Sequence, residues 1–371
     1  RKPKTSSIKI LSKSPSKSRS TPKSNALERV HPLLQSRDVK SDREPMKLLS
    51  HTNKGFSFSM TDKLLNTLND FSSTSQDTFN VIGVIGATGC GKSHILNLLL
   101  SGDDVFPVES THCQLNGLHQ TEGVDIALSK RDGLLLLDTQ PLHSASLLSK
   151  MMENTESSHD LFERHQLESV ELMVLMLNIC DCLVFVQDES VSIEFWQSFQ
   201  AALTLSKAVP HLTHISHHQL MNKKATGRLA NASSNDKARH FHAQPHIVFV
   251  FNKWPDLHFT KSTTNQLKQA VNQYFASLLH AKEKGLSVFF LANNTNHHAS
   301  TSDAMALKNC THTFQHDVQT LTALIRNQAA STKRGTMHAR EWINQARMVW
   351  EFIELSQDIA NYQQLLNESL K

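Results

Sequence analysis

The stretch that most constrains the fold is VIGVIGATGCGKSHILNLLL, residues 81–100. An apolar run leads into a segment that fits G-x-x-x-x-G-K-[ST], from Gly86 to Ser93, and apolar residues then recur at helical spacing. Glycines there allow backbone angles closed to other residues, so successive amide groups can wrap a phosphate at the N-terminus of the helix. The stretch therefore predicts an α/β fold that binds a nucleotide.

Each part of this loop has an expected role. Lys92 should reach the β- and γ-phosphates, the Ser93 hydroxyl should bind Mg²⁺, and the His94 amide should lie near the α-phosphate. The residues predicted to bind the phosphates are Ala87, Thr88, Gly89, Cys90, Gly91, Lys92, Ser93 and His94.

Two more residues are predicted to help Ser93 hold Mg²⁺. Thr121, in HQTEGVD, stands where a switch threonine would touch the ion, although an ordinary loop threonine before a strand explains it equally well. Asp138 ends the apolar run of LLLLDTQP and is placed to hold Mg²⁺ through water. The expected ligands are therefore Mg²⁺ with GDP or GTP, or with ATP.

The segment after Asp138 departs from the D-x-x-G pattern of GTPases. Pro141 replaces the glycine whose amide grips the γ-phosphate, and proline has no N–H to donate. Leu142 stands where a residue often orients the attacking water, and Gln140, a candidate substitute, lies two positions early. We therefore expect little or no hydrolysis and no enzyme. The alternative is a switching GTPase or ATPase that a partner completes, for example with an arginine.

A base-reading motif begins at VFVFNKWPD. Asn252 should support the loops, and the stem of Lys253 should lie against the base. The guanine-reading aspartate of N-K-x-D would fall at 255, which is proline, and Asp256 comes one residue late. Asn293 is predicted in the last base-side loop. The choice between guanine and adenine stays open.

The rest of the chain organises around this site. Residues 1–56 are predicted to be a disordered basic Ser/Lys-rich tail. Residues 57–330 are predicted to form a P-loop, G-domain-like unit with a disordered polar insertion at about 208–244. Residues 331–371 should hold one C-terminal helix, at 339–366, that packs on the domain or a partner. A mostly parallel sheet with helices on both faces is expected, with strands at 80–85, 124–128, 133–137, 181–187, 246–251 and 287–292.

Composition limits the function classes. Of 371 residues 39% are hydrophobic and 19% charged, which indicates a mostly globular chain. Residues 1–23 carry eight Lys or Arg and no acid, so with +4 overall the remainder carries −4. An RNA-binding role for the tail ranks third among the hypotheses, and we expect no direct RNA contact. Five widely spaced cysteines and no long apolar span or signal predict a reduced cytosolic or nuclear protein without membrane contact, and of the two locations we expect the cytoplasm.

Several of these motifs occur together in one known family. The phosphate loop, TEGVD, LLLLDTQPL, VFVQD, FNK and NQARMVWEFIELSQDIANYQQLL resemble, in order, the ninth factor of the SMG series of nonsense-mediated mRNA decay proteins. The similarity spans about residues 64–366, and DTQPL is its most specific piece. The resemblance implies a G-fold subunit that binds nucleotide without evident hydrolysis. It also implies pairing with the SMG-eight factor and restraint of the SMG-one kinase, a PI3-kinase-like enzyme.

Overall fold

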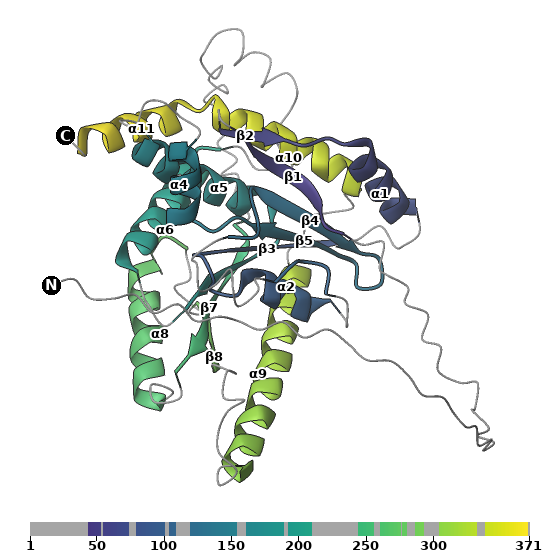
Figure 1. Cartoon of the computed structure of the whole chain (residues 1–371), viewed down its shortest axis with the longest axis vertical. Coiled ribbons are helices and arrows are strands. Elements are labelled where there is room, and N and C mark those ends of the chain that lie inside the picture. Colours follow the sequence, from purple (N-terminus) through teal and green to yellow (C-terminus); the bar gives the residue numbers. More distant parts are fainter. Residues whose placement is uncertain are drawn as a thin grey trace, which may run out of the picture. The chain divides into compact units, whose positions relative to one another are not determined.

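The computed structural model describes thirteen stretches of the chain (Figure 1): 44–52, 55–73, 79–100, 104–108, 119–153, 161–188, 192–209, 244–255, 260–275, 277–279, 286–292, 304–331 and 338–369. All of them belong to the unit that begins at Arg43. The basic head of the predicted tail, nearly all of the predicted insertion at 208–244, and Asn293 lie outside these residues.

The described strands form one sheet in the order β2-β1-β4-β5-β3-β6-β7-β8. The five strands from β5 to β8 pair in parallel, whereas β4, β1 and β2 join the β5 side in antiparallel fashion. The strands are β1 Met46–Thr52, β2 Gly55–Phe58, β3 Asn80–Gly86, β4 Val124–Ser129, β5 Leu134–Thr139, β6 Cys182–Gln187, β7 His246–Trp254 and β8 Ser287–Ala292.

Helices cover both faces of this sheet (Figure 1). One face carries α1, α5, α6, α8, α10 and α11, and the other carries α2 and α9. The bounds are α1 Asp62–Ser73, α2 Lys92–Leu99, α4 Ala145–Glu153, α5 Leu161–Ile179, α6 Ile193–Ser206, α8 Lys261–Phe275, α9 Ala304–Ser331, α10 Ala339–Glu354 and α11 Gln357–Ser369.

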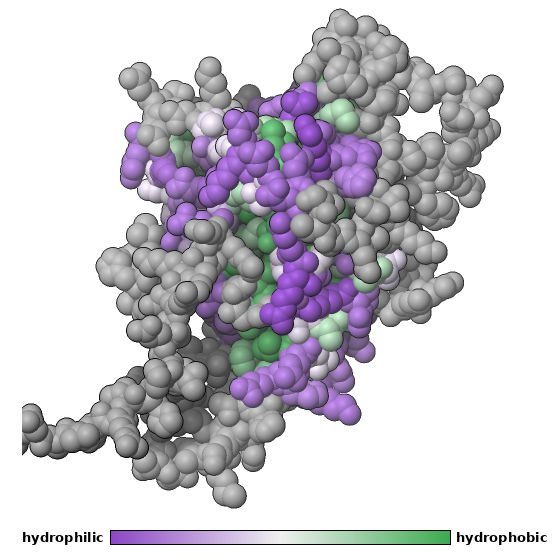
Figure 2. All heavy atoms as spheres, turned by 90° about the vertical axis from the view of Figure 1, so that its right-hand side faces the viewer, coloured by the Kyte–Doolittle hydropathy of each residue, from purple (hydrophilic) through white to green (hydrophobic). Residues whose placement is uncertain are grey.

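The central strands are apolar on both sides because each side meets helices. In β3, Val81 and Ile85 pack into the core under α5 and α10, whereas Ile82 and Val84 pack into the core under α2 and α9. A strand buried on both faces loses the alternation of polar and apolar residues. The predicted α/β, mostly parallel fold is therefore confirmed. On the face shown in Figure 2, hydrophilic side chains border a narrow band of apolar ones.

The predicted disorder of residues 1–56 is wrong for the part of this segment that forms strands. Residues 46–52 and 55–58 form β1 and β2, and β1 pairs with β4. Leu48 and Leu49 are fully buried there. The apolar residues are too few to indicate a strand alone, and they become buried because β4 offers an open edge.

The prediction of one helix over 339–366 is also wrong. The chain turns at Leu355 and Ser356, where the Ser356 amide donates to the Ile353 carbonyl at 3.0 Å. No glycine or proline marks this break in the sequence. The break separates α10, which packs on α1 and α5, from α11, whose main contacts are with α5.

Glu171, on α5, makes the stability of this fold depend on pH. Burial, reinforced by the carboxylates of Glu168 and Glu354, raises the pKa of Glu171 from 4.5 to about 8. The native state therefore holds this proton between those two values while the unfolded state has lost it, so stability falls as pH rises through the window. The slope is at most about 1.4 kcal/mol per pH unit.

Glu171→Gln removes this titration and is expected to flatten the loss of stability between about pH 5 and pH 8. Urea denaturation at a series of pH values measures the slope for each protein. Glu153→Gln, at an exposed position on α4, is the matched control and should leave the slope unchanged. Equal slopes for Glu171→Gln and the parent chain would contradict the assignment.

Candidate nucleotide site

The loop between β3 and α2 has the backbone that its glycines predict. Gly89 and Gly91 have φ angles of 69° and 94°, in the region that favours glycine. A Cβ atom on Gly91 would lie 2.3 Å from Nδ2 of Asn252, so this position also needs glycine for space. The local sequence therefore sets the loop, and a residue from β7 fits closely against it.

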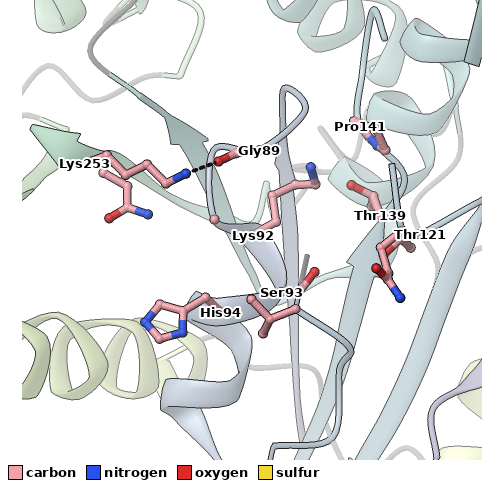
Figure 3. A pocket seen from close by; sticks show the side chains of 12 residues that line it. Gly89, Lys92, Ser93, His94, Thr121, Thr139, Pro141 and Lys253 are labelled. Carbon is pink, nitrogen blue, oxygen red and sulfur yellow. Dashed lines mark hydrogen bonds between the residues drawn. The ribbon is translucent and has the colours of Figure 1, made fainter. Parts of the chain in front are cut away.

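Strand β7 brings the predicted base-side residues to the loop (Figure 3). Asn252 Nδ2 donates to the Cys90 carbonyl at 2.9 Å, and Lys253 Nζ donates to the Gly89 carbonyl at 2.7 Å. Lys253 has a φ of 56°, unusual for a residue other than glycine. Two hydrogen bonds across 162 and 164 positions of sequence thus join the base-side motif to the phosphate loop.

These elements enclose a cavity of about 200 Å³, here called the loop cavity. Figure 3 shows Lys92, Ser93 and His94 on one side, with Thr121, Thr139 and Pro141 across from them. Its lining residues are Gly89, Gly91, Lys92, Ser93, His94, Val108, Gln120, Thr121, Thr139, Pro141, Asn252 and Lys253. The structure therefore brings together phosphate-loop, switch-like and base-side residues that the sequence places far apart.

The predicted magnesium residues also meet. Oδ2 of Asp138 accepts hydrogen bonds from Ser93 Oγ at 2.7 Å and from Thr121 Oγ1 at 3.0 Å. Oδ1 of Asp138 is buried without a hydrogen-bond partner among the described residues. Burial raises the pKa of Asp138 to about 6, against the lowering effect of the Lys92 charge. Oxygen donors with an unmet carboxylate oxygen fit Mg²⁺, which would neutralise phosphate charge when bound.

The Lys92 side chain folds back onto the loop between β3 and α2. Its Nζ donates to the Ala87 carbonyl at 2.9 Å, and the residue is only 7% exposed. A buried ammonium that meets only a backbone carbonyl retains donors for an anion. His94 lies in the first turn of α2, and burial lowers the pKa of its ring, so the neutral form is favoured.

The segment after Asp138 does not restore the missing γ-phosphate contact. Pro141 lines the cavity without a donor, and the amide of Leu142, the next along the chain, donates to the Gly86 carbonyl at 3.1 Å. Gln140 was a candidate to orient water, and this interpretation is wrong. Its Oε1 accepts from the Gly123 amide at 2.8 Å, and the residue is 1% exposed.

Three cavity residues were not predicted from the sequence. Thr139 belongs to DTQP and Gln120 adjoins Thr121, so both motifs carried a signal that could have found them. Val108 has no such signal, because only folding brings its segment to the cavity. Among the predicted base-side residues, Asn293 lies outside the described residues, as does Asp256.

The described residues were also examined for membrane-spanning helices and for clusters of metal-binding His, Cys, Asp or Glu side chains, and they contain neither. No helix among them combines the length and apolar character needed to cross a membrane. In the same stretches, no group of three or more His, Cys, Asp or Glu residues is arranged to hold a metal ion.

Comparison with curated proteins confirms the resemblance that the motifs predicted. The chain is 27% identical to nonsense-mediated mRNA decay factor SMG9 of Salmo salar over 216 residues, 55% of this chain and 39% of that protein. It is 26% identical to SMG9 of Xenopus laevis over 204 residues, 52% of this chain and 37% of that protein. The match thus spans about two fifths of these relatives. No protein-family model matches the chain.

Solved structures give more distant similarities. Toc33 from Arabidopsis thaliana in complex with Mg²⁺ and GMPPNP aligns at 14% identity and a TM-score of 0.38, covering 74% of this chain and 95% of that one. Bacterial selenocysteine-specific elongation factor EF-Sec aligns at 11% identity and a TM-score of 0.29, covering 64% and 29%. Scores this low carry no argument about the site.

Proposed function

We propose that this chain is a nucleotide-binding regulatory subunit in nonsense-mediated mRNA decay, and that it holds its nucleotide rather than hydrolysing it. The observation that carries the first part is the loop cavity, where Lys92, the Ser93–Thr121–Asp138 cluster and the Asn252–Lys253 pair converge. The role in decay rests on the similarity to SMG9, whose name states that role for those proteins.

The lack of hydrolysis rests on the segment around Pro141. An enzyme that cleaves the γ-phosphate needs donors where charge develops and a group that orients water. Here Pro141 has no N–H, the Leu142 amide bonds to Gly86, and the Gln140 side chain bonds to Gly123. The second candidate is a switching GTPase or ATPase that a partner completes, and the intact oxygen cluster around Asp138 favours it.

Partner and location follow from the same resemblance and remain proposals. The chain would pair with the SMG-eight factor and restrain the SMG-one kinase, in the cytoplasm and without contacting RNA directly. In this role a bound nucleotide stabilises the folded subunit that partners recognise, by roughly 4 kcal/mol at a thousandfold excess over the dissociation constant.

The test is to purify the full chain, denature it, and identify and count any released nucleotide by chromatography. One diphosphate or triphosphate per chain, unchanged after prolonged incubation with Mg²⁺, is expected, and its base settles guanine against adenine. Steady turnover of added GTP or ATP that Lys92→Ala abolishes would establish the switching alternative instead.

The geometry around Pro141 also predicts poor discrimination between diphosphate and triphosphate. Without an amide aimed at the γ-phosphate, Lys92 and Mg²⁺ are the expected contacts left to favour triphosphate, so the two dissociation constants should agree within about tenfold, less than one charge-assisted hydrogen bond contributes. Titration calorimetry with GDP and a non-hydrolysable GTP analogue, or the adenine pair, measures the ratio. Pro141→Gly returns an amide and should raise the triphosphate preference. A parent chain that already prefers triphosphate by more than about tenfold contradicts this prediction.

A further inference from the structure

A second and larger cavity lies behind the phosphate loop. Its volume is about 780 Å³, within the range of ligand pockets, and we call it the rear cavity. The segment after β5 and the helices α4, α5, α6 and α11 supply most of its walls. Leu142, Leu148, Phe195, Tyr362 and Leu366 make much of the lining apolar. None of the roles described above uses this cavity.

The rear cavity and the loop cavity share a wall. Ala87 and residues 142–145 line the rear cavity, while Gly89 and Pro141, their neighbours in sequence, line the loop cavity. Two hydrogen bonds join the segments that follow β3 and β5 in this wall, from the Leu142 amide to the Gly86 carbonyl at 3.1 Å and from Thr88 Oγ1 to Ser144 Oγ at 3.0 Å. An occupant of one cavity therefore presses on residues that shape the other.

Two histidines, His143 and His165, are among the residues that line the rear cavity. Nε2 of His165 and Nε2 of His143 are both buried without a partner among the described residues, and His165 is only 4% exposed. Burial lowers the pKa of both rings, that of His143 to about 4, so both are neutral near pH 7. As neutral rings, the two histidines therefore add no positive charge to the lining of the cavity.

The charged and exposed apolar side chains in and beside the rear cavity indicate what kind of molecule would bind there. Asp188 and Glu194 line the cavity, and no Lys or Arg is among the lining residues within the part of the chain that the structure describes. Phe162 lines it while 47% exposed, and Ile193 and Leu365, each adjoining lining residues in sequence, are 55% and 62% exposed. Apolar surface that extends past the cavity suits a polypeptide better than a small molecule, and the carboxylates suit a basic one.

We propose that the rear cavity receives an apolar segment of a partner polypeptide that carries lysine or arginine, and that its binding is coupled to nucleotide binding across the shared wall. The docking part stands apart from the proposed function, whereas the coupling part rests on it. Coupling of this kind is reciprocal: whatever factor the segment applies to nucleotide affinity, nucleotide applies to the affinity for the segment.

The probe for docking is a fluorescent helical peptide of leucine and lysine, of about 18 residues, with a leucine–glutamate peptide of the same pattern as its charge-reversed control. Fluorescence anisotropy with the full chain should show the lysine peptide binding at least about tenfold more tightly. Ser198→Trp on α6 fills the cavity and should weaken binding about tenfold. Gln200→Trp, exposed on the same helix, should not.

A second variant, at the edge of the cavity, is needed because a folding defect in Ser198→Trp would also weaken peptide binding. Phe162→Lys changes a side chain that is already 47% exposed, so the fold should tolerate it, and it replaces apolar docking surface with a charge that repels the lysine peptide. It too should weaken lysine-peptide binding. Equal affinity for the two peptides, or full affinity in both cavity variants, overturns the docking proposal. So does a small molecule, other than nucleotide, recovered from the denatured chain while the peptide fails to bind.

Coupling is measured separately, by titrating fluorescent GDP and ADP with and without saturating lysine peptide. The nucleotide dissociation constant should change by about fivefold or more, and the peptide constant by the same factor when nucleotide is present. Peptide binding with unchanged nucleotide affinity overturns the coupling. Peptide binding to a chain that takes up neither nucleotide leaves docking established and shows instead that the proposed function is wrong.

Discussion

Gly123→Ala is expected to lower the free energy of unfolding by about 2–6 kcal/mol, because backbone strain and overpacking each cost about 1–3 kcal/mol. Gly123 has a φ of 72°, and an added Cβ atom would lie 1.9 Å from the Leu49 carbonyl oxygen. That neighbour is backbone of β1, which is fixed by pairing with β4, so neither side can move away.

Gly123→Ala should also disturb the candidate nucleotide site. The Gly123 amide donates to Gln140 Oε1, and the Gly123 carbonyl accepts from the Gln140 amide at 2.7 Å, so a shift at this position displaces the segment between Thr121 and Asp138. Urea denaturation with an unchanged slope measures the stability. Gly55→Ala is the matched control: φ there is 113°, yet the nearest atoms are side chains at 3.8 Å. If both variants lose the same amount, the close contact with β1 is not the cause.

Lys92→Ala is expected to weaken nucleotide binding by about 10- to 150-fold, the equivalent of about 1.5–3 kcal/mol for hydrogen bonds to a charged group. The empty chain should lose little, because Lys92 gives up one hydrogen bond, to the Ala87 carbonyl. Added nucleotide should therefore raise the melting temperature of the parent chain and leave that of the variant almost unchanged at the same concentration.

The control for this comparison is Lys130→Ala, which removes the same charge from an exposed position in the turn after β4. Its melting temperature should respond to nucleotide as the parent's does. If Lys92→Ala keeps the full nucleotide response, phosphate binding by the loop is wrong. If it loses the response yet keeps partner affinity, the nucleotide has no structural role in the complex.

Most of the fold was predictable because its signals are local. The apolar runs of β3, β6 and β7 and the helical spacing of α2 mark buried elements, whatever packs on them. The edge strands β1 and β2 were not predictable, since their burial depends on the open side of β4. The break between α10 and α11 likewise depends on packing rather than on a residue that ends helices.

The residues of the candidate site also divide into those that local sequence patterns predict and those that only the structure places. G-x-x-x-x-G-K-S and Asn252–Lys253 are contiguous patterns, and the structure places them in contact. The sequence of Thr121 and its neighbours fits a magnesium-binding residue and an ordinary loop residue equally well. Its hydrogen bond to Asp138 in the structure places it beside the predicted magnesium residues. Gln140 was misinterpreted because its distance from the expected position cannot show which way a side chain points.

By itself the sequence determined that a glycine-rich loop of the G-x-x-x-x-G-K-S pattern joins a buried strand to a helix, and that Pro141 cannot donate a hydrogen bond, since both follow from residue chemistry and short-range spacing. Only the tertiary structure decided that the Leu142 amide donates to Gly86 and that a second cavity adjoins the first. It also decided that one carboxylate oxygen of Asp138 has no hydrogen-bond partner among the described residues. These features arise where segments tens to hundreds of residues apart meet at the carboxyl ends of parallel strands, and no periodicity along the chain records such a meeting.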